Sequence, residues 1–305
     1  MAYTVNALPD YVEQNRLPLL AASVLKGKTV EVINRQSGIK GKAALNIVDI
    51  TAPFQAGNTC GFNASGNDTF SQRVIETVMV KVEKEWCWKN LIGKWAEYLV
   101  RVNGDQSSLP FEQYVMDGLV AEINKKIEKL IWQGDKTLTT DPNLKWIDGL
   151  LTQFAADTDV VKEAIAAGTS AYDAILAVYM ALPEEVLDRN AVIFVSPATY
   201  REFVQDLVNK NFYHCSGPQD VAPEEFIFPG TDVRVVKAPG LAGTAKPKLV
   251  GTWADNLVYG TDMENDNEDI YIEYERKSQV FHLTAAWASG IAYYFPQFIV
   301  EGTIG

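Results

Sequence analysis

A long turn-forming segment between two strand patterns most constrains what this chain can fold into. Residues 46–50 have a strand pattern, and residues 72–85 have a longer one whose side chains alternate between two faces. The intervening residues 57–69 are rich in Gly, Asn, Ser and Thr, which favour turns. At about 3.3 Å per residue the longer strand would extend about 45 Å, further than most compact domains need. We therefore predict a projecting β-hairpin over 46–85, in preference to a disordered surface loop.

Residues 109–134 have the pattern of one long amphipathic helix. Pro110 stands near its first turn, and Gly134 is a typical residue to end it. The apolar stripe consists of Val115, Leu119, Ile123, Ile127, Leu130 and Ile131. The charged residues predicted on the other face are Glu122, Lys125, Lys126, Glu128 and Lys129. Such a helix is about 35 Å long at about 1.5 Å per residue. Its single stripe predicts that it lies across a sheet or groove.

Shorter helix and strand patterns alternate after residue 135. Ser170 has the position of a helix N-cap, and residues 191–195 have the composition of a buried strand. The pair Ser196-Pro197 is typical of the start of a further helix, with Ser as N-cap and Pro at the first helical position. This alternation predicts an α/β or α+β domain whose helices flank a mixed sheet.

The first 45 residues differ in character from the rest of the chain. A short helix is predicted over 10–25, broken by Pro18. Through residue 50 the net charge is +2, whereas residues 255–275 contain eight acidic side chains and no basic one. Because residues 1–45 lack the apolar periodicity needed for a core of their own, we expect them to lie along another part of the protein.

The overall charge excludes a protein that grips nucleic acid over its surface. With 27 basic and 39 acidic residues the formal charge is −12, whereas tight phosphate binding needs clustered Lys and Arg. The three cysteines are far apart, which argues against a disulfide framework, and the N-terminus lacks the pattern of a secretory signal. A reducing cytoplasm is therefore the expected compartment.

The uncharged segment 278–300 is long enough to cross a bilayer. Its apolar residues Phe281, Leu283, Ala285 and Trp287 recur with the strand period of two, and polar residues interrupt it. Buried strands are therefore predicted here instead of a membrane span.

No arrangement of residues typical of an active site is found in the sequence. The two histidines are His214, which is next to Cys215, and His282; a loop role and a structural role are predicted for them. There is no nucleophile elbow, phosphate-binding loop or dinucleotide-binding motif, and the acidic run 264–269 lacks the spacing of a calcium loop. We therefore predict a protein that is not an enzyme and uses no metal or cofactor.

Three stretches carry a family resemblance in their order along the chain. The first is the end of the long helix at 131–135 (IWQGD), the second is 191–200 (AVIFVSPATY), and the third runs from 256–262 (NLVYGTD) to 290–294 (GIAYY). They are similar to the spine helix, the axial-domain strand and helix, and the closing strands of the major capsid proteins of tailed bacteriophages. The fold of that family is often called Hong Kong ninety-seven.

The resemblance implies an α+β fold with an arm, an extended loop and two domains. Residues 1–45 would form the N-terminal arm, 46–85 the extended hairpin loop, 86–145 with 268–289 the peripheral domain around the spine helix, and 146–267 with 290–305 the axial domain. The implied function is structural. Many copies would assemble into hexamers and pentamers of an icosahedral shell that encloses double-stranded DNA of a phage or prophage.

The implied main partner is the chain itself, followed by portal, scaffolding and decoration proteins. Packaged DNA would be contacted weakly and without sequence specificity, and no membrane is involved. The implied location is the virion capsid, assembled in the cytoplasm of the bacterial host. Candidate subunit-interface residues are aromatic or charged residues of the predicted hairpin, long helix and acidic segment: Phe54, Phe62, Phe70, Arg73, Lys125, Lys126, Lys129, Asp262, Glu264 and Asp266.

Two departures from the family pattern refine these expectations. Some relatives carry a scaffolding segment before the arm, but here Met1 lies close to the arm, so a separate scaffolding protein or none is expected. Others link subunits covalently through a hairpin lysine, but no lysine lies between Lys42 and Lys81. Two alternatives stay open: an encapsulin-like nanocompartment shell, and an α/β enzyme with a lid over 57–69.

Overall fold

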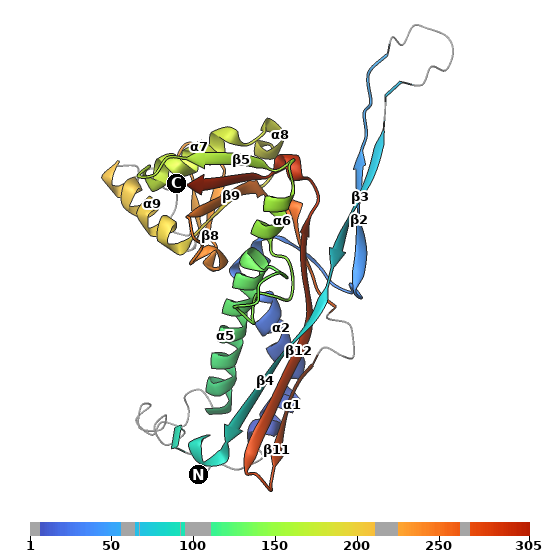
Figure 1. Cartoon of the computed structure of the whole chain (residues 1–305), viewed down its shortest axis with the longest axis vertical. Coiled ribbons are helices and arrows are strands. Elements are labelled where there is room, and N and C mark those ends of the chain that lie inside the picture. Colours follow the sequence, from blue (N-terminus) through green and yellow to red (C-terminus); the bar gives the residue numbers. More distant parts are fainter. Residues whose placement is uncertain are drawn as a thin grey trace.

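The computed structural model describes residues 7–55, 65, 66, 68–91, 93, 94, 111–210, 225–262 and 269–305. Within these residues the strands form three sheets, of five, six and two strands. Figure 1 shows a long sheet beside a long helix, a domain at one end of that helix, and a two-stranded hairpin that extends beyond the body. The hairpin that the turn-rich sequence predicts is therefore present.

The five-stranded sheet is built around one long strand, β12 (Val280–Tyr293). It pairs antiparallel with β4 (Val78–Cys87), β11 (Asp269–Glu275) and β10 (Leu257–Gly260), and β10 pairs in parallel with β1 (Asn34–Gln36). Strand formation within 278–300 is confirmed, with Phe281, Leu283, Ala285 and Trp287 buried. His282 departs from the prediction, because alternation turns it to the exposed face, where Nε2 lies 3.5 Å from Glu275 Oε2.

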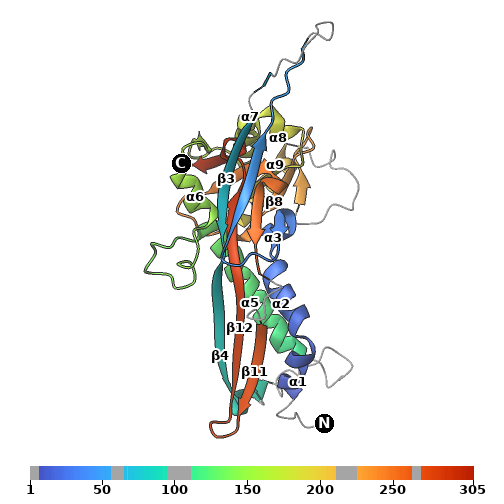
Figure 2. The ribbon, with the colours of Figure 1, turned by 90° about the vertical axis from the view of Figure 1, so that its right-hand side faces the viewer.

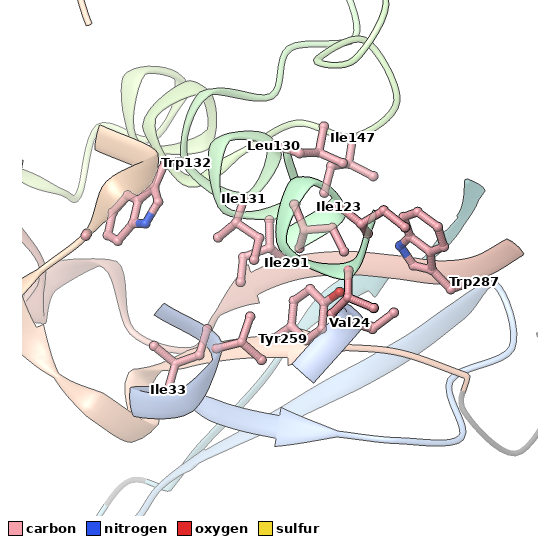
Figure 3. Close-up of a cluster of buried hydrophobic side chains, with 14 of the residues drawn as sticks. Val24, Ile33, Ile123, Leu130, Ile131, Trp132, Ile147, Tyr259, Trp287 and Ile291 are labelled. Carbon is pink, nitrogen blue, oxygen red and sulfur yellow. The ribbon is translucent and has the colours of Figure 1, made fainter. Parts of the chain in front are cut away.

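The long helix α5 (Phe111–Gln133) packs against this sheet and against the N-terminal helices α1 (Ala7–Gln14), α2 (Arg16–Leu25) and α3 (Lys28–Val32). Figure 3 shows the core that they share, to which Val24 and Ile33 of the N-terminal segment, Ile123 of α5 and Trp287 of β12 all contribute. The N-terminal segment thus lies along α5, as expected from its lack of a core of its own.

The six-stranded sheet has the order β5-β13-β9-β6-β8-β7. Its strands are β5 (Val161–Ile165), β6 (Ala191–Val195), β7 (Glu225–Ile227), β8 (Arg234–Lys237), β9 (Lys248–Trp253) and β13 (Val300–Ile304). The helices of this domain are α6 (Leu150–Ala156), α7 (Ala171–Ala181), α8 (Glu184–Leu187) and α9 (Pro197–Asn209). Single 3-10 turns lie at Pro239–Leu241, Ala254–Asn256 and Pro296–Phe298.

Strand β6 joins the two cores of the molecule. Ile193 and Val195 belong to the cluster under α7, whereas Val192 and Phe194 belong to the cluster around α5, where the rings of Phe194 and Trp132 lie 5.3 Å apart. All five residues of β6 are therefore buried, as the sequence predicts. The predicted caps are also confirmed: Ser170 accepts a hydrogen bond from the Asp173 backbone N–H, and Ser196 accepts one from that of Thr199.

The predicted strand over 72–85 is wrong, because two strands occupy this region. β3 (Thr69–Glu76) pairs with β2 (Lys42–Asp49) in the hairpin, whereas β4 pairs with β12. The chain changes sheets at Thr77, whose hydroxyl donates to the Ile39 carbonyl at 3.0 Å. The projecting hairpin therefore ends at residue 76, and β4 is part of the long sheet.

Strand pairing crosses two of the predicted domain limits, which stay predictions. β10 lies inside the predicted axial segment 146–267 but pairs with β12 of the long sheet. β12 continues through the predicted limit at 289 without interruption. A division of the sequence into consecutive segments does not take account of this hydrogen bonding between strands.

Pro18 does not break the N-terminal helix as predicted. The break lies at Asn15, and Pro18 occupies the first turn of α2, where its missing N–H costs no helical hydrogen bond. Among the helices that are described, none combines the length and apolarity that a membrane crossing requires.

Candidate assembly surfaces

The β2–β3 hairpin has two faces of different character, fixed by its antiparallel register. Leu45 pairs with Arg73 and Ile47 with Ser71 on one face, whereas Val48 pairs with Phe70 on the other. Because side chains alternate along a strand, each face has its own set of contacts. Figure 2 shows the hairpin passing along the body before it extends beyond it.

The inner face attaches the hairpin to the body. Leu45 and Ile75 are buried in a small cluster with Ile39, Val258 and Ala292. Two glycines of the long sheet make this approach possible. A Cβ at Gly260 would lie 2.7 Å from Ile75 Cδ1, and one at Gly290 would meet the Glu76 carbonyl oxygen. The base of the hairpin is therefore packed as tightly as a core.

The outer face is apolar and exposed. Phe70 has 74% of its surface accessible and lies opposite Val48, and Val74 lies four residues further along β3 on the same face. Ile50 and Phe54 continue the exposed apolar residues toward the tip, and Phe54 is fully exposed. Bulky apolar side chains placed directly opposite one another on an accessible sheet face are typical of an interaction surface.

A polar cluster holds the inner face to the six-stranded domain. Arg73 Nη2 lies 2.7 Å from Asp157 Oδ2, and the Tyr293 hydroxyl donates to the same oxygen at 2.8 Å. The Arg73 guanidinium also lies over the Tyr293 ring, 4.5 Å from its centre. The cluster thus links β3, the residue after α6 and the last residue of β12.

The electrostatics of this cluster favour the ion pair. Burial alone would raise the pKa of Asp157, but hydrogen bonds from Arg73, the Asp159 backbone N–H and Tyr293 outweigh it, so the pKa lies below its ordinary value. Burial, together with the hydrogen bond to Asp157, raises the pKa of Tyr293 to about 12. Asp157 is thus ionised and Tyr293 neutral over the physiological range.

A second ion-pair group lies at the base of the hairpin. Glu76 Oε2 lies 2.9 Å from Lys136 Nζ, and Glu76 Oε1 lies 3.4 Å from Lys42 Nζ. Hydrogen bonding from Lys136, followed by Lys42, lowers the pKa of Glu76. These groups are largely exposed, so they orient the base of the hairpin more than they stabilise it.

On the face of the long sheet away from the hairpin, a groove lies between β4 and α5. Val80 and Val82 of β4, Ile127 of α5, and Trp146 line it, and Lys126 lies at its rim. Trp146 is 42% exposed. In the described part of the chain β4 pairs with β12 alone, so its other edge is free to meet a further chain.

The structure separates the predicted interface residues into four groups. Phe54 and Phe70 are exposed on the hairpin, and Lys125, Lys126 and Lys129 lie on the outer side of α5. Arg73 makes a contact within the chain. Asp262 is only 3% exposed, which contradicts its selection as a surface charge, because the end of β10 places it inside the protein. Phe62, Glu264 and Asp266 lie outside the described residues.

Sequence reasoning missed Val48 and Val74. Their signal was the alternation of the hairpin itself: Val48 lies two residues from Asn46 and opposite Phe70, and Val74 lies opposite Ala44. That signal is usable only once the register is known. No cluster of three or more potential metal-binding side chains occurs among the described residues.

The comparisons with known proteins agree with this architecture. The model of the phage capsid family matches residues 104–219. No curated protein matches the sequence. Among solved structures, a chain of the satellite phage P4 procapsid is 13% identical with a TM-score of 0.61, over 94% of this chain and 98% of that one. A capsid chain of an empty GTA particle is 10% identical with a TM-score of 0.56, over 93% and 90%.

A virus-like particle from Pyrococcus furiosus has the same fold. It is 10% identical with a TM-score of 0.52, over 96% of this chain and 99% of that one. At such identities the comparisons concern the fold, and they confirm the capsid-type α+β fold predicted from the sequence.

Proposed function

We propose that this chain is a major capsid protein, many copies of which close into an icosahedral shell. The outer face of the β2–β3 hairpin carries the proposal. Its inner face is packed on the body, yet Val48, Phe70 and Val74 remain exposed on a rigid strand pair. Covering that face requires another molecule. The phage capsid match over 104–219 and the shell-protein fold support a structural protein over an enzyme.

The covering molecule in this proposal is a second copy of the chain. The hairpin lies at one end of the long axis (Figure 1). The groove between β4 and α5 lies elsewhere on the same chain. A contact between two different surfaces of identical chains is heterologous, and it forms a ring where the rotation between copies closes; hexamers and pentamers are the rings of this proposal. The free edge of β4 and the lysines of α5 form the surface that we expect to receive the neighbour.

Double-stranded DNA is the proposed content of the shell. A chain with a formal charge of −12 does not bind phosphates tightly, and weak contact lets a genome enter and leave. The further proposed partners are portal, scaffolding and decoration proteins, and the proposed site of assembly is the cytoplasm of a bacterial host.

The test is electron microscopy of the full-length protein expressed alone and at increasing concentration. Closed shells of uniform diameter are the expected result. A chain that stays monomeric at high concentration, both alone and with the proteins encoded beside it, would contradict the proposal.

A nanocompartment shell is the second candidate, favoured by the similarity to the Pyrococcus furiosus particle. It differs in content, since its cargo is an enzyme and not a genome. Neighbouring genes for a portal and a DNA-packaging motor would support the capsid, and a single neighbouring enzyme gene would support the compartment. Nuclease-protected DNA in particles from the native host gives the same distinction directly.

A further inference from the structure

A buried carboxylate joins the N-terminal helices to α5. Glu128 is only 3% exposed, although the helical pattern predicts it on the charged face. Its Oε1 accepts a hydrogen bond from the Thr29 backbone N–H at 2.7 Å, and its Oε2 accepts one from Thr29 Oγ1, also at 2.7 Å. Thr29 belongs to the first turn of α3, so one side chain of α5 holds this short helix by its backbone and its side chain.

The side chain of Glu128 is in close contact with its neighbours. Trp132 Nε1 donates to Thr29 Oγ1 at 2.8 Å, so the hydroxyl accepts from the indole and donates to the carboxylate. A Cβ at Gly27 would lie 2.7 Å from Glu128 Oε1. Figure 3 shows Trp132 of α5 and Ile33, the residue that follows α3. The carboxylate therefore has direct protein contacts in place of bulk water.

The charged side chains near Glu128 do not neutralise the negative charge of its ionised carboxylate. The elements packed here are α3 and the turn Pro239–Leu241, which has no ionisable side chain. From α3, Glu31 acts with the same sign, and Lys28 pairs with Glu31 at 3.3 Å. Among the described residues no cation forms an ion pair with Glu128. A buried carboxylate without a cation is costly in its ionised form.

We propose that Glu128 is a proton-sensitive lock, which holds α3 on α5 more tightly when it is protonated and more loosely when it is ionised. A protonated carboxyl can keep both contacts, accepting from the Thr29 N–H and donating to Thr29 Oγ1. Burial raises the pKa of Glu128, and the hydrogen bonds from Thr29 and the Val30 N–H only partly offset this.

The sign of the pH dependence follows from linkage. A pKa that is higher in the docked than in the undocked state means that the docked state binds the proton more tightly. Docking is therefore strongest below the undocked pKa and weakens as the pH rises through the docked pKa. One group changes the opening equilibrium by at most about tenfold per pH unit. The inference goes beyond shell formation, because it concerns the arm of a single chain.

Hydrogen exchange of the unassembled full-length protein tests the proposal between pH 5 and 9, with intrinsic rates corrected. The protection of residues 27–33 should fall as the pH rises in the wild type. Glu128→Gln, whose neutral amide can keep both contacts with Thr29, should remove this dependence. Glu122→Gln on the exposed side of α5 is the matched control and should behave like the wild type.

A flat pH profile in the wild type, or an unchanged slope in Glu128→Gln, would overturn the proposal. If Glu128→Gln does not fold, Thr29→Val gives a second test. Loss of the hydroxyl that donates to the carboxylate should raise the pH at which protection is lost. Thr29→Ser keeps the hydroxyl and should leave that pH unchanged. An unmoved midpoint in Thr29→Val would also overturn the lock. Because the unassembled chain is measured, failure here leaves the shell proposal untouched.

Discussion

The Arg73 guanidinium lies 2.7 Å from the Asp157 carboxylate and connects the projecting hairpin to the residue that follows α6. The pair is partly buried, and the Tyr293 hydroxyl donates a second hydrogen bond to the same carboxylate oxygen. A charged hydrogen bond in this setting is worth about 2 kcal/mol. The direction in which the hairpin leaves the body therefore depends on residues 84 positions apart in the sequence.

Arg73→Ala should loosen the hairpin without unfolding the protein. Removal of the guanidinium leaves Asp157 with fewer donors, so the free energy of local opening at residues 69–76 should fall by about 2 kcal/mol. Hydrogen exchange of that segment measures it. Gln72→Ala is the control, because Gln72 lies on the other face of β3 and its side chain bonds to exposed Asn46 of β2. Equal effects of the two variants would show that the Asp157 contact has no special role.

Phe70→Glu should prevent particle formation but keep the fold. Phe70 is exposed in the single chain, so the free energy of unfolding should change by no more than about 0.5 kcal/mol. A charge in an apolar contact between subunits must instead be desolvated, which opposes assembly. Light scattering and thermal unfolding separate the two effects, and Phe70→Leu should still assemble. Normal shells from Phe70→Glu would exclude the outer face as a contact.

Glu301→Ala should destabilise the six-stranded domain, and more at neutral than at acid pH. Glu301 is buried and lies 2.6 Å from Lys162 Nζ and 2.7 Å from Lys248 Nζ. Since Lys162 is half exposed and can be rehydrated, the loss should be about 2 to 3 kcal/mol, below that of a fully buried pair.

The pH dependence of this effect has a definite sign. Burial raises the pKa of Glu301, but the two lysines outweigh it, so the folded pKa lies below its ordinary value. Its contribution is present above the unfolded pKa and disappears as the pH falls through the folded one. Urea unfolding at several pH values should therefore show the wild type approaching Glu301→Ala in acid. Glu202→Gln, exposed on α9, should match the wild type at every pH.

Local sequence patterns predicted where helices and strands lie better than they predicted which parts of the chain contact one another. Ser170 and Ser196 cap their helices, and β6 is buried, because such features depend on neighbouring residues. The strand over 72–85 was wrong because Thr77 moves the chain between two sheets, and Glu128 is buried by α3, about a hundred residues away. Contacts across long separations have no periodic signal in one sequence. Phe54 and Phe70 are exposed, and their role in a contact between subunits stays a prediction.

Gly240→Ala should destabilise the joint between α5 and the six-stranded domain. A Cβ at Gly240 would overlap the Glu128 carbonyl oxygen and the Trp132 ring, and the backbone oxygen cannot move aside. Overpacking of this kind costs roughly 1 to 3 kcal/mol. Gly118→Ala on α5 is the opposite control: its Cβ meets nothing within 4 Å, so helix propensity should stabilise the protein by roughly 0.5 to 1 kcal/mol. Chemical denaturation measures both, and equal signs would contradict the packing argument.

Assembled particles boiled in SDS should run as monomers. A covalent bond from the hairpin to a neighbour through an amide requires a lysine amine, and no lysine lies between Lys42 and Lys81. Lys42 pairs with Glu76 at the base, and Lys81 pairs with Glu83 on β4, so neither is carried at the tip. In the proposed shell, strength would then rest on a cement protein or on non-covalent contacts such as the outer face of Val48 and Phe70, which SDS disrupts. Glutaraldehyde-treated particles are the control and should give a ladder. A ladder from untreated particles would show that another residue forms the covalent link.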